Sequence, residues 1–145
     1  MTAPVTSMAT SYKAELLQAK HDHTAGTGHV FKVALYRAAA SCGGTHDATE
    51  TNYANMGSDE LPAEGGYTTG GYAWTAAQNI TPASGGTTAF TSWSTYPFWG
   101  LCTFTTSGFL IYNSTSDGRA VGNFSFGGDQ VITEGTLTIG LPSNE

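Results

Sequence analysis

Short apolar runs that end in Gly, Asn or Thr recur along this chain, which is typical of a compact antiparallel β-protein. In Phe31–Arg37, the residues Phe31, Val33 and Leu35 fall on one face, and the residues between them fall on the other. This period of two predicts a half-buried strand. The other runs of this kind are Gly66–Trp74, Phe104–Asn113 and Arg119–Pro142.

The second half of the chain predicts several strands separated by turns. Strands are expected over Tyr72–Ile80, Thr88–Trp93, Leu101–Thr105, Phe109–Asn113, Ala120–Phe126 and Thr136–Leu141. Ser114–Gly118 closes with Asp-Gly, a pair that favours tight hairpin turns, and Gly127–Asp129 is expected to turn the chain again. With roughly seven to nine short strands, the fold is predicted to be an antiparallel β-sandwich or a jelly-roll-like barrel, and the pattern leaves both open.

One stretch near the start has the spacing of a helix. Ser11–Lys20 places Tyr12, Leu16 and Ala19 on one face, and Ser11 is positioned to cap the first turn. A helix this short has to dock against the body of the protein to be stable. The preceding residues 1–10 are small and polar. They predict a flexible N-terminal arm, ordered only on binding, ahead of a single β-domain over residues 11–145.

Between the first predicted strand and the next lies Ala38–Gly71, a long polar connection. Connections of this length in a small domain are usually functional or interface loops. Within it Asp59, Glu60 and Leu61 are candidate interface residues, in a Ser-Asp-Glu-Leu-Pro segment that predicts a single helical turn. Paired catalytic carboxylates could be drawn from this loop, but their clustering at one place favours a solvated loop end instead.

Composition excludes several classes of function. Charged residues make up 11% of the chain against a typical value of about 25%, and the net charge is −6. The five Lys and Arg residues are scattered, so a groove for nucleic acid is not expected. The N-terminus lacks the pattern of a signal peptide, and no apolar stretch is long enough to span a membrane, so we expect synthesis in the cytoplasm without membrane contact.

Few residues suggest chemistry. His21 and His23 are the weak candidates for a metal site, but no acidic or Cys partner stands at a recognised spacing, and His is also favoured at the end of a helix by the helix dipole. The chain has neither a nucleophile elbow nor a phosphate-binding loop. The sequence therefore predicts no catalytic residues, no cofactor and no enzymatic activity.

An aromatic segment follows the predicted Thr88–Trp93 strand. Its candidate interface residues are Trp93, Tyr96, Pro97, Phe98 and Trp99. Core packing accounts for some of these rings, but four large aromatics around one proline exceed what a single bend needs. Trp and Tyr are common anchors of protein interfaces, so both readings stay open.

A series of short motifs occurs in a characteristic order. They are Ser11–Gln18, Gly28–Tyr36, Gly66–Gly71, Thr103–Phe104, Gly108–Asn113, Arg119–Val121, Phe126–Asp129 and Gly135–Ile139. In this order they resemble a family of short virion structural proteins of tailed bacteriophages and prophages, over about nine-tenths of the chain. The segments 92–99 and 19–29 depart from that pattern.

The resemblance implies a structural role in the virion, most simply as a capsid decoration, or cement, protein. Its partners would then be the major capsid protein and further copies of itself, as a dimer or trimer. The arm and the long loop would make most of the contacts. The alternative is a tail, fibre or adhesin-type component that contacts a glycan or receptor on the host surface. A small hydrolase is a third class, but the chain offers no context for a nucleophile.

Overall fold

The computed structural model describes residues 3–23, 27–74, 81–82, 89–90 and 98–139. Of the aromatic candidates, Trp93, Tyr96 and Pro97 lie outside the described residues. Of the predicted strand Tyr72–Ile80 only residues 72–74 are described, and of Thr88–Trp93 only residues 89–90. The backbone of Phe98 and Trp99 is described, but their side chains are not.

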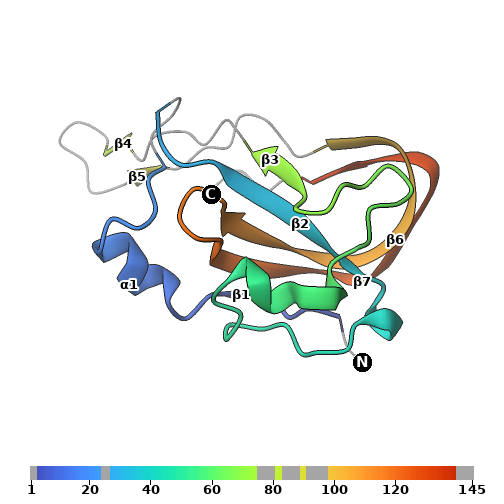
Figure 1. Ribbon diagram of the computed structural model, residues 1–145, viewed down its shortest axis with the longest axis horizontal. Coiled ribbons are helices and arrows are strands. Elements are labelled where there is room, and N and C mark those ends of the chain that lie inside the picture. Colours follow the sequence, from blue (N-terminus) through green and yellow to red (C-terminus); the bar gives the residue numbers. More distant parts are fainter. Residues whose placement is uncertain (1–2, 24–26, 75–80, 83–88, 91–97, 140–145) are drawn as a thin grey trace.

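Five antiparallel strands form one open sheet in the order β1-β7-β6-β2-β3 (Figure 1). The strands are β1 (Ser7–Met8), β2 (Phe31–Arg37), β3 (Tyr72–Trp74), β6 (Phe98–Asn113) and β7 (Arg119–Thr138). A separate pair consists of β4 (Thr81–Pro82) and β5 (Ala89–Phe90). The prediction of a mainly β, antiparallel protein is confirmed. The five-stranded sheet is not closed into a barrel.

The long hairpin of β6 and β7 forms the centre of the sheet. Its turn is the predicted Ser114–Gly118, in which Asp117 and Gly118 take φ values of +51° and +71°, the left-handed region that Asp-Gly tolerates. Both strands are longer than predicted. β6 unites the two strands expected over Leu101–Thr105 and Phe109–Asn113, and β7 continues past the expected strand end at Phe126.

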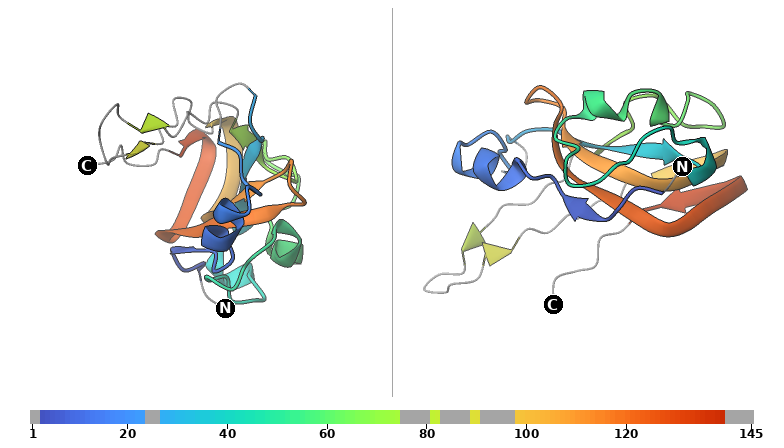
Figure 2. Two further views of the ribbon diagram at one scale, coloured as in Figure 1. Left: turned by 90° about the vertical axis from the view of Figure 1, so that its left-hand side faces the viewer. Right: turned by 90° about the horizontal axis from the view of Figure 1, so that it is seen from below.

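The predicted turn at Gly127–Asp129 is wrong, because β7 runs through it without reversing. Gly127 has φ +78°, and the pairing of β6 with β7 shifts register between Thr106 and Gly108. The sheet bends here, as Figure 2 shows for the curved pair of strands. Glycine at such a position supplies a bulge that kinks a strand without ending it.

Both faces of β2 are covered, so the predicted half-buried strand is wrong. One core contains Phe31, Val33 and Leu35 of β2 together with apolar residues of β6, among them Cys102, Phe104, Phe109 and Ile111. The second core contains Ala34 and Tyr36 from the opposite face of β2, with Leu110, Tyr112 and Ala120 beside them. A strand buried on both faces usually reads as continuously apolar, whereas β2 also carries Lys32 and Arg37, both at half-buried positions.

The long loop closes the second core. It includes two short 3₁₀ helices, η1 (Ala39–Ser41) and η2 (Tyr53–Asp59), and contributes Cys42 and Met56 to that core. Figure 2 shows the loop lying over one side of the sheet. Because the loop covers apolar side chains, its conformation is coupled to the packing of the sheet.

Residues 3–10, predicted as a flexible arm, lie along the edge of the sheet. Ser7 and Met8 pair with Asn123 and Gly122 of β7, and the backbone amide of Val5 donates to the carbonyl of His46 at 2.8 Å. Pro4 is fully buried. These backbone and apolar contacts hold the segment against the body of the same chain.

The predicted helix is present but shorter, as α1 (Tyr12–Leu17), and its docked face differs from the prediction. Glu15 is its buried residue, whereas Leu17 is 92% exposed. Ser11 occupies the N-cap position without a side-chain capping bond. The helix is held by polar contacts, because Arg119 of β7 donates to Oε1 of Glu15 at 2.9 Å.

Candidate functional site

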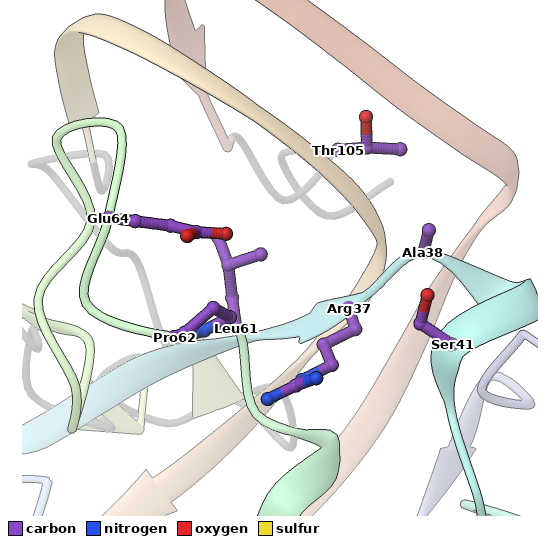
Figure 3. A pocket seen from close by; sticks show the side chains of 7 residues that line it. All are labelled: Arg37, Ala38, Ser41, Leu61, Pro62, Glu64 and Thr105. Atoms are coloured by element: carbon purple, nitrogen blue, oxygen red, sulfur yellow. The ribbon is translucent and has the colours of Figure 1, made fainter.

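A polar pocket of about 260 Å³ opens where β2 meets the long loop (Figure 3). Its lining comes from three places: the end of β2, the loop and β6. The lining residues are Arg37, Ala38, Ser41, Leu61, Pro62, Glu64 and Thr105. The pocket combines one guanidinium, one carboxylate and two hydroxyls with apolar walls, which suits a small polar group with an apolar body.

The backbone of Arg37 is fixed from several sides. The pairing of β2 with β6 is irregular between Leu35 and Arg37, as at a β-bulge, which re-aims the side chain at the strand end. The carbonyl of Arg37 accepts a hydrogen bond from Ser107 Oγ at 2.7 Å. Nε of Arg37 donates to the carbonyl of Glu60 at 3.1 Å. The guanidinium is therefore held at the pocket rather than left to sample solvent.

The opposite wall is set by a tight loop against β6. The amide of Thr103 donates to the carbonyl of Gly65 at 2.8 Å. A side chain on Gly65 would place its Cβ 1.9 Å from the carbonyl oxygen of Thr103, and this glycine has φ +56°. Only glycine fits such a close approach, and it fixes the neighbouring Glu64 at the rim of the pocket.

Glu60 anchors the loop beneath the pocket. Its carboxylate accepts hydrogen bonds from the hydroxyls of Tyr53 and Tyr67, at 2.6 and 2.8 Å, and from the amide of Gly70 at 2.6 Å. Burial, followed by the nearby Glu60 charge, raises the pKa of Tyr67. The hydroxyl therefore stays protonated and serves as a donor, and the arrangement ties η2 to the chain leading into β3.

A second carboxylate cluster surrounds His46. Its Nδ1 lies 2.5 Å from Glu50 Oε2, and its Nε2 lies 2.9 Å from Asp59 Oδ2. Burial by itself would lower the pKa of His46, but the bonds to both carboxylates outweigh burial and raise it. The amides of Gly43 and Gly44 donate to the same Asp59 carboxylate, each at 2.8 Å.

The structure places the interface candidates Asp59, Glu60 and Leu61 inside these contacts. All three are buried, with exposed fractions of 7%, 8% and 4%. The two carboxylates are occupied by donors of their own chain, and Leu61 packs in the first core. In the chain by itself they hold the loop in place.

The histidines near α1 take structural positions. Nε2 of His21 lies 2.8 Å from Glu15 Oε2, and Nε2 of His23 lies 3.0 Å from the hydroxyl of Tyr12. His23 also stacks on Phe31, with ring centroids 4.3 Å apart. Burial lowers the pKa of His23 to about 4, so the ring is neutral at physiological pH.

Within the described part of the chain, no group of three or more His, Cys, Asp or Glu residues is arranged to hold a metal ion. In that same part, no helix has the length and apolar character needed to cross a membrane. The weak metal candidates His21 and His23 are instead buried among aromatic and polar side chains.

Comparison with protein-family models, with curated proteins and with solved structures found no match to this chain.

Sequence reasoning missed the pocket and Arg37. The sequence pattern places Arg37 at the end of one strand, Ser41 in a loop and Thr105 in another strand. The lining residues are separated by up to one half of the chain, so no local motif joins them. The one available signal was a cation at the end of an apolar strand.

Proposed function

We propose that this chain is a bacteriophage virion structural protein, acting as a capsid decoration protein that binds the lattice of the major capsid protein and stabilises the head. The proposal rests first on the order of sequence motifs that resemble such proteins. Its partners would be the major capsid protein and copies of itself, and its location would be the virion, after synthesis in the host bacterial cytoplasm. No nucleic acid, membrane or cofactor takes part in this role.

The structural observation that carries the proposal is the position of exposed apolar side chains. Among the described residues, the N-terminal segment and α1 expose Val5 by 53%, Met8 by 52%, Leu16 by 36% and Leu17 by 92%. Four of the seven exposed large apolar side chains in the described residues thus lie between Val5 and Leu17 in the sequence, and exposed apolar side chains are available for contact with a partner. The N-terminal region therefore supports the role assigned to the predicted arm, although it already lies on the sheet.

The edge strand adds a second way to bind. β1 pairs with β7 on one side and ends the order of the sheet on the other. Exposed strand edges can accept a strand from a partner through backbone hydrogen bonds. The amides of Val5 and Thr10, which flank β1, already donate to the carbonyls of His46 and Ala48 in the long loop, so only the edge of Ser7–Met8 itself is offered to a neighbour in this proposal. Val5, Met8 and Leu17 contribute apolar contact.

The finer fold belongs to the same proposal. We infer that the bent sheet is part of a β-sandwich or jelly-roll, as expected for a decoration protein with two layers of strands. The curvature of β6 and β7 supports this inference, because bending brings distant parts of one sheet toward each other. An experimental structure of the whole chain tests it: a single layer with no second sheet over the first core would contradict it.

The deciding experiment for the function is the copy number in purified particles. Mass spectrometry would compare this chain with the major capsid protein. A decoration protein should occur at one copy per capsid subunit or at a simple fraction of that number, which means hundreds of copies. A few to a few dozen copies, or none, would contradict the proposal.

A surface variant tests the assigned contact region. Leu17→Gln removes a side chain that is 92% exposed, so the free energy of unfolding should change by less than about 0.5 kcal/mol. When the purified variant is added to capsids made without this protein, its binding should nevertheless be at least about tenfold weaker than that of the natural chain, the size expected for an interface anchor. Val131→Gln, at a side chain 72% exposed on β7, is the matched control and should bind normally. Equal occupancy for both variants would contradict the assignment.

The second candidate is a tail, fibre or adhesin-type component that contacts a host-surface glycan or receptor. The pocket beside Arg37 favours it, because a polar concave site suits a small ligand. A glycan array probed with the purified chain separates the two candidates. Specific binding to a glycan, together with low copy number, would favour the adhesin.

A further inference from the structure

Arg37 is a partly buried cation that lines the pocket. Acidic residues outnumber Lys and Arg by 11 to 5, yet no carboxylate in the described part of the chain forms an ion pair with Arg37. The other arginine, Arg119, is paired with Glu15 at 2.9 Å. Partly buried arginines are normally paired, so an Arg that lines a pocket without an acidic partner suggests an anionic ligand.

The guanidinium is also oriented in advance. Its Nε donates to the carbonyl of Glu60, which is fixed in turn because the Glu60 side chain accepts three hydrogen bonds. The two terminal nitrogens keep their donors in the planar fork that matches a carboxylate. Orientation before binding reduces the entropy lost when a ligand is held.

The rest of the lining fits a carboxylate on an apolar stem. Ser41 and Thr105 add hydroxyl groups to the lining, on the far side of the pocket from the Arg37 guanidinium, and Ala38, Leu61 and Pro62 add apolar side chains (Figure 3). Apolar walls lower the local dielectric and strengthen the contact between charges. Glu64 is exposed and stands on the other side of the pocket, so it weakens but does not cancel the attraction.

We propose that this pocket is a carboxylate-binding site in which the guanidinium of Arg37 is the anchor. The carboxylate can belong to a small free molecule or to an acidic side chain of a protein. This binding is a property of the isolated chain and does not depend on a role in the virion.

The test is a titration of the ¹⁵N-labelled whole chain, followed by NMR. The first probe is acetate, and its control is acetamide, which has the same shape without the charge. The second probe is glutamate blocked at both its amino and its α-carboxyl group, so that only the side-chain carboxylate remains. Acetate should cause saturable shifts of the Arg37 Nε–H signal and of the Ala38 and Ser41 amides, and acetamide should not.

The two probes distinguish the sources of the ligand. Binding of acetate together with blocked glutamate supports a site that accepts a protein side chain. Binding of acetate without blocked glutamate supports a site for small free carboxylates. If neither probe gives saturable shifts, or if acetamide gives the same shifts as acetate, the proposal is overturned.

Variants give the second line of evidence. Arg37→Lys keeps the charge but loses the fork, so affinity for acetate should fall about tenfold, and Arg37→Gln should abolish binding. Glu64→Gln should tighten binding by about two- to fivefold, because a repelling charge is removed at an exposed rim. Lys32→Gln, on the same strand but outside the pocket, is the control and should bind as the natural chain does.

Two results would contradict the role of Arg37 even if acetate binds. One is unchanged affinity in a folded Arg37→Gln variant, as judged by its dispersed spectrum. The other is weaker acetate binding in Glu64→Gln. If Arg37→Gln does not fold, Arg37→Lys and the pair of acetate and acetamide still decide the question.

Discussion

Titratable residues of the long loop hold it in place through hydrogen bonds and ring contacts. His46 bridges Glu50 and Asp59, and the ring of Tyr36 lies against it with centroids 4.4 Å apart. A neutral histidine has a single N–H, so it can donate to one carboxylate only, whereas the charged form donates to both. The protonation state of this one residue thus sets how firmly the loop is attached to the sheet.

His46 should make stability depend on pH. Because the folded pKa is raised above the unfolded value, its contribution is fully present below about pH 6.5 and is lost as pH rises through the folded pKa. His46→Phe keeps a ring against Tyr36 but removes the partner of the buried Glu50 carboxylate and leaves Asp59 with the amides of Gly43 and Gly44 alone. It should reduce the free energy of unfolding by about 3 kcal/mol at pH 6, and by less at pH 9.

Urea denaturation of both proteins at the two pH values measures this effect. Leu17→Gln is the control, since its side chain is exposed and its small effect should not vary with pH. A difference between natural and His46→Phe protein that stays constant from pH 6 to pH 9 would show that His46 does not carry the pH dependence.

At the scale of elements, glycines decide where segments can approach each other. Gly71 precedes β3 and has φ +74°, and a Cβ there would lie 1.9 Å from the carbonyl oxygen of Val33 in β2. Gly57 in η2 also has a positive φ, at +52°, but a Cβ there would have nothing within 4 Å. A side chain at Gly57 would therefore meet backbone strain alone, whereas a side chain at Gly71 would meet backbone strain and also collide with β2.

Alanine substitutions at these glycines should differ in cost. Gly57→Ala meets strain alone and should lower the free energy of unfolding by about 1 kcal/mol. Gly71→Ala also forces β3 away from β2 and should lower it by about 3 kcal/mol or more. Thermal unfolding of both variants provides the measurement. Similar costs for the two would mean that β3 shifts without loss of packing.

Elements that depend on neighbouring residues in the sequence could be predicted, and those that depend on contacts with remote residues could not. The alternation of side chains predicts the strand Phe31–Arg37, and the Asp-Gly pair predicts the turn at Ser114–Gly118. Both predictions are confirmed. A glycine pair is common in turns and predicts one at Gly127, but β7 continues because Ser125 and Gln130, on either side of this position, both pair with β6. That pairing partner is remote in sequence and leaves no local signal.

The candidate site was less predictable for the same reason. Asp59 and Glu60 looked like a solvated loop end, since nothing nearby in sequence shows that Gly43, His46, Tyr53 and Tyr67 supply donors to them. The exposure of Leu17 was also missed, because Glu15 is buried by an ion pair with Arg119 rather than by apolar spacing. Pairing between distant polar groups overrode the hydrophobic pattern of the helix.

At the scale of the whole molecule, one central strand holds two cores together. β6 pairs with β7 on one side and with β2 on the other, and its residues alternate between the first core and the second. β1, in contrast, pairs through two residues at the edge. Stability should therefore decline from the centre of the sheet to its edge.

Hydrogen exchange should map this gradient. The amides of Phe109, Leu110 and Ile111 should exchange most slowly, at rates set by global unfolding, because both neighbours of β6 must separate to expose them. The amides of Ser7 and Met8 should exchange faster by at least about tenfold, through local opening of the edge. Exchange by β1 as slow as that of β6 would show that the N-terminal segment is an inseparable part of the central unit.

The two cysteines lie on opposite sides of the sheet, Cys42 in the second core and Cys102 in the first. Both are buried, so a thiol-modifying reagent can reach each one only when its own side opens. Timed labelling followed by peptide mass mapping would then give a separate labelling rate for each thiol in the natural chain. Cys42 would record the lifting of the long loop, and Cys102 would record the opening of the curved hairpin.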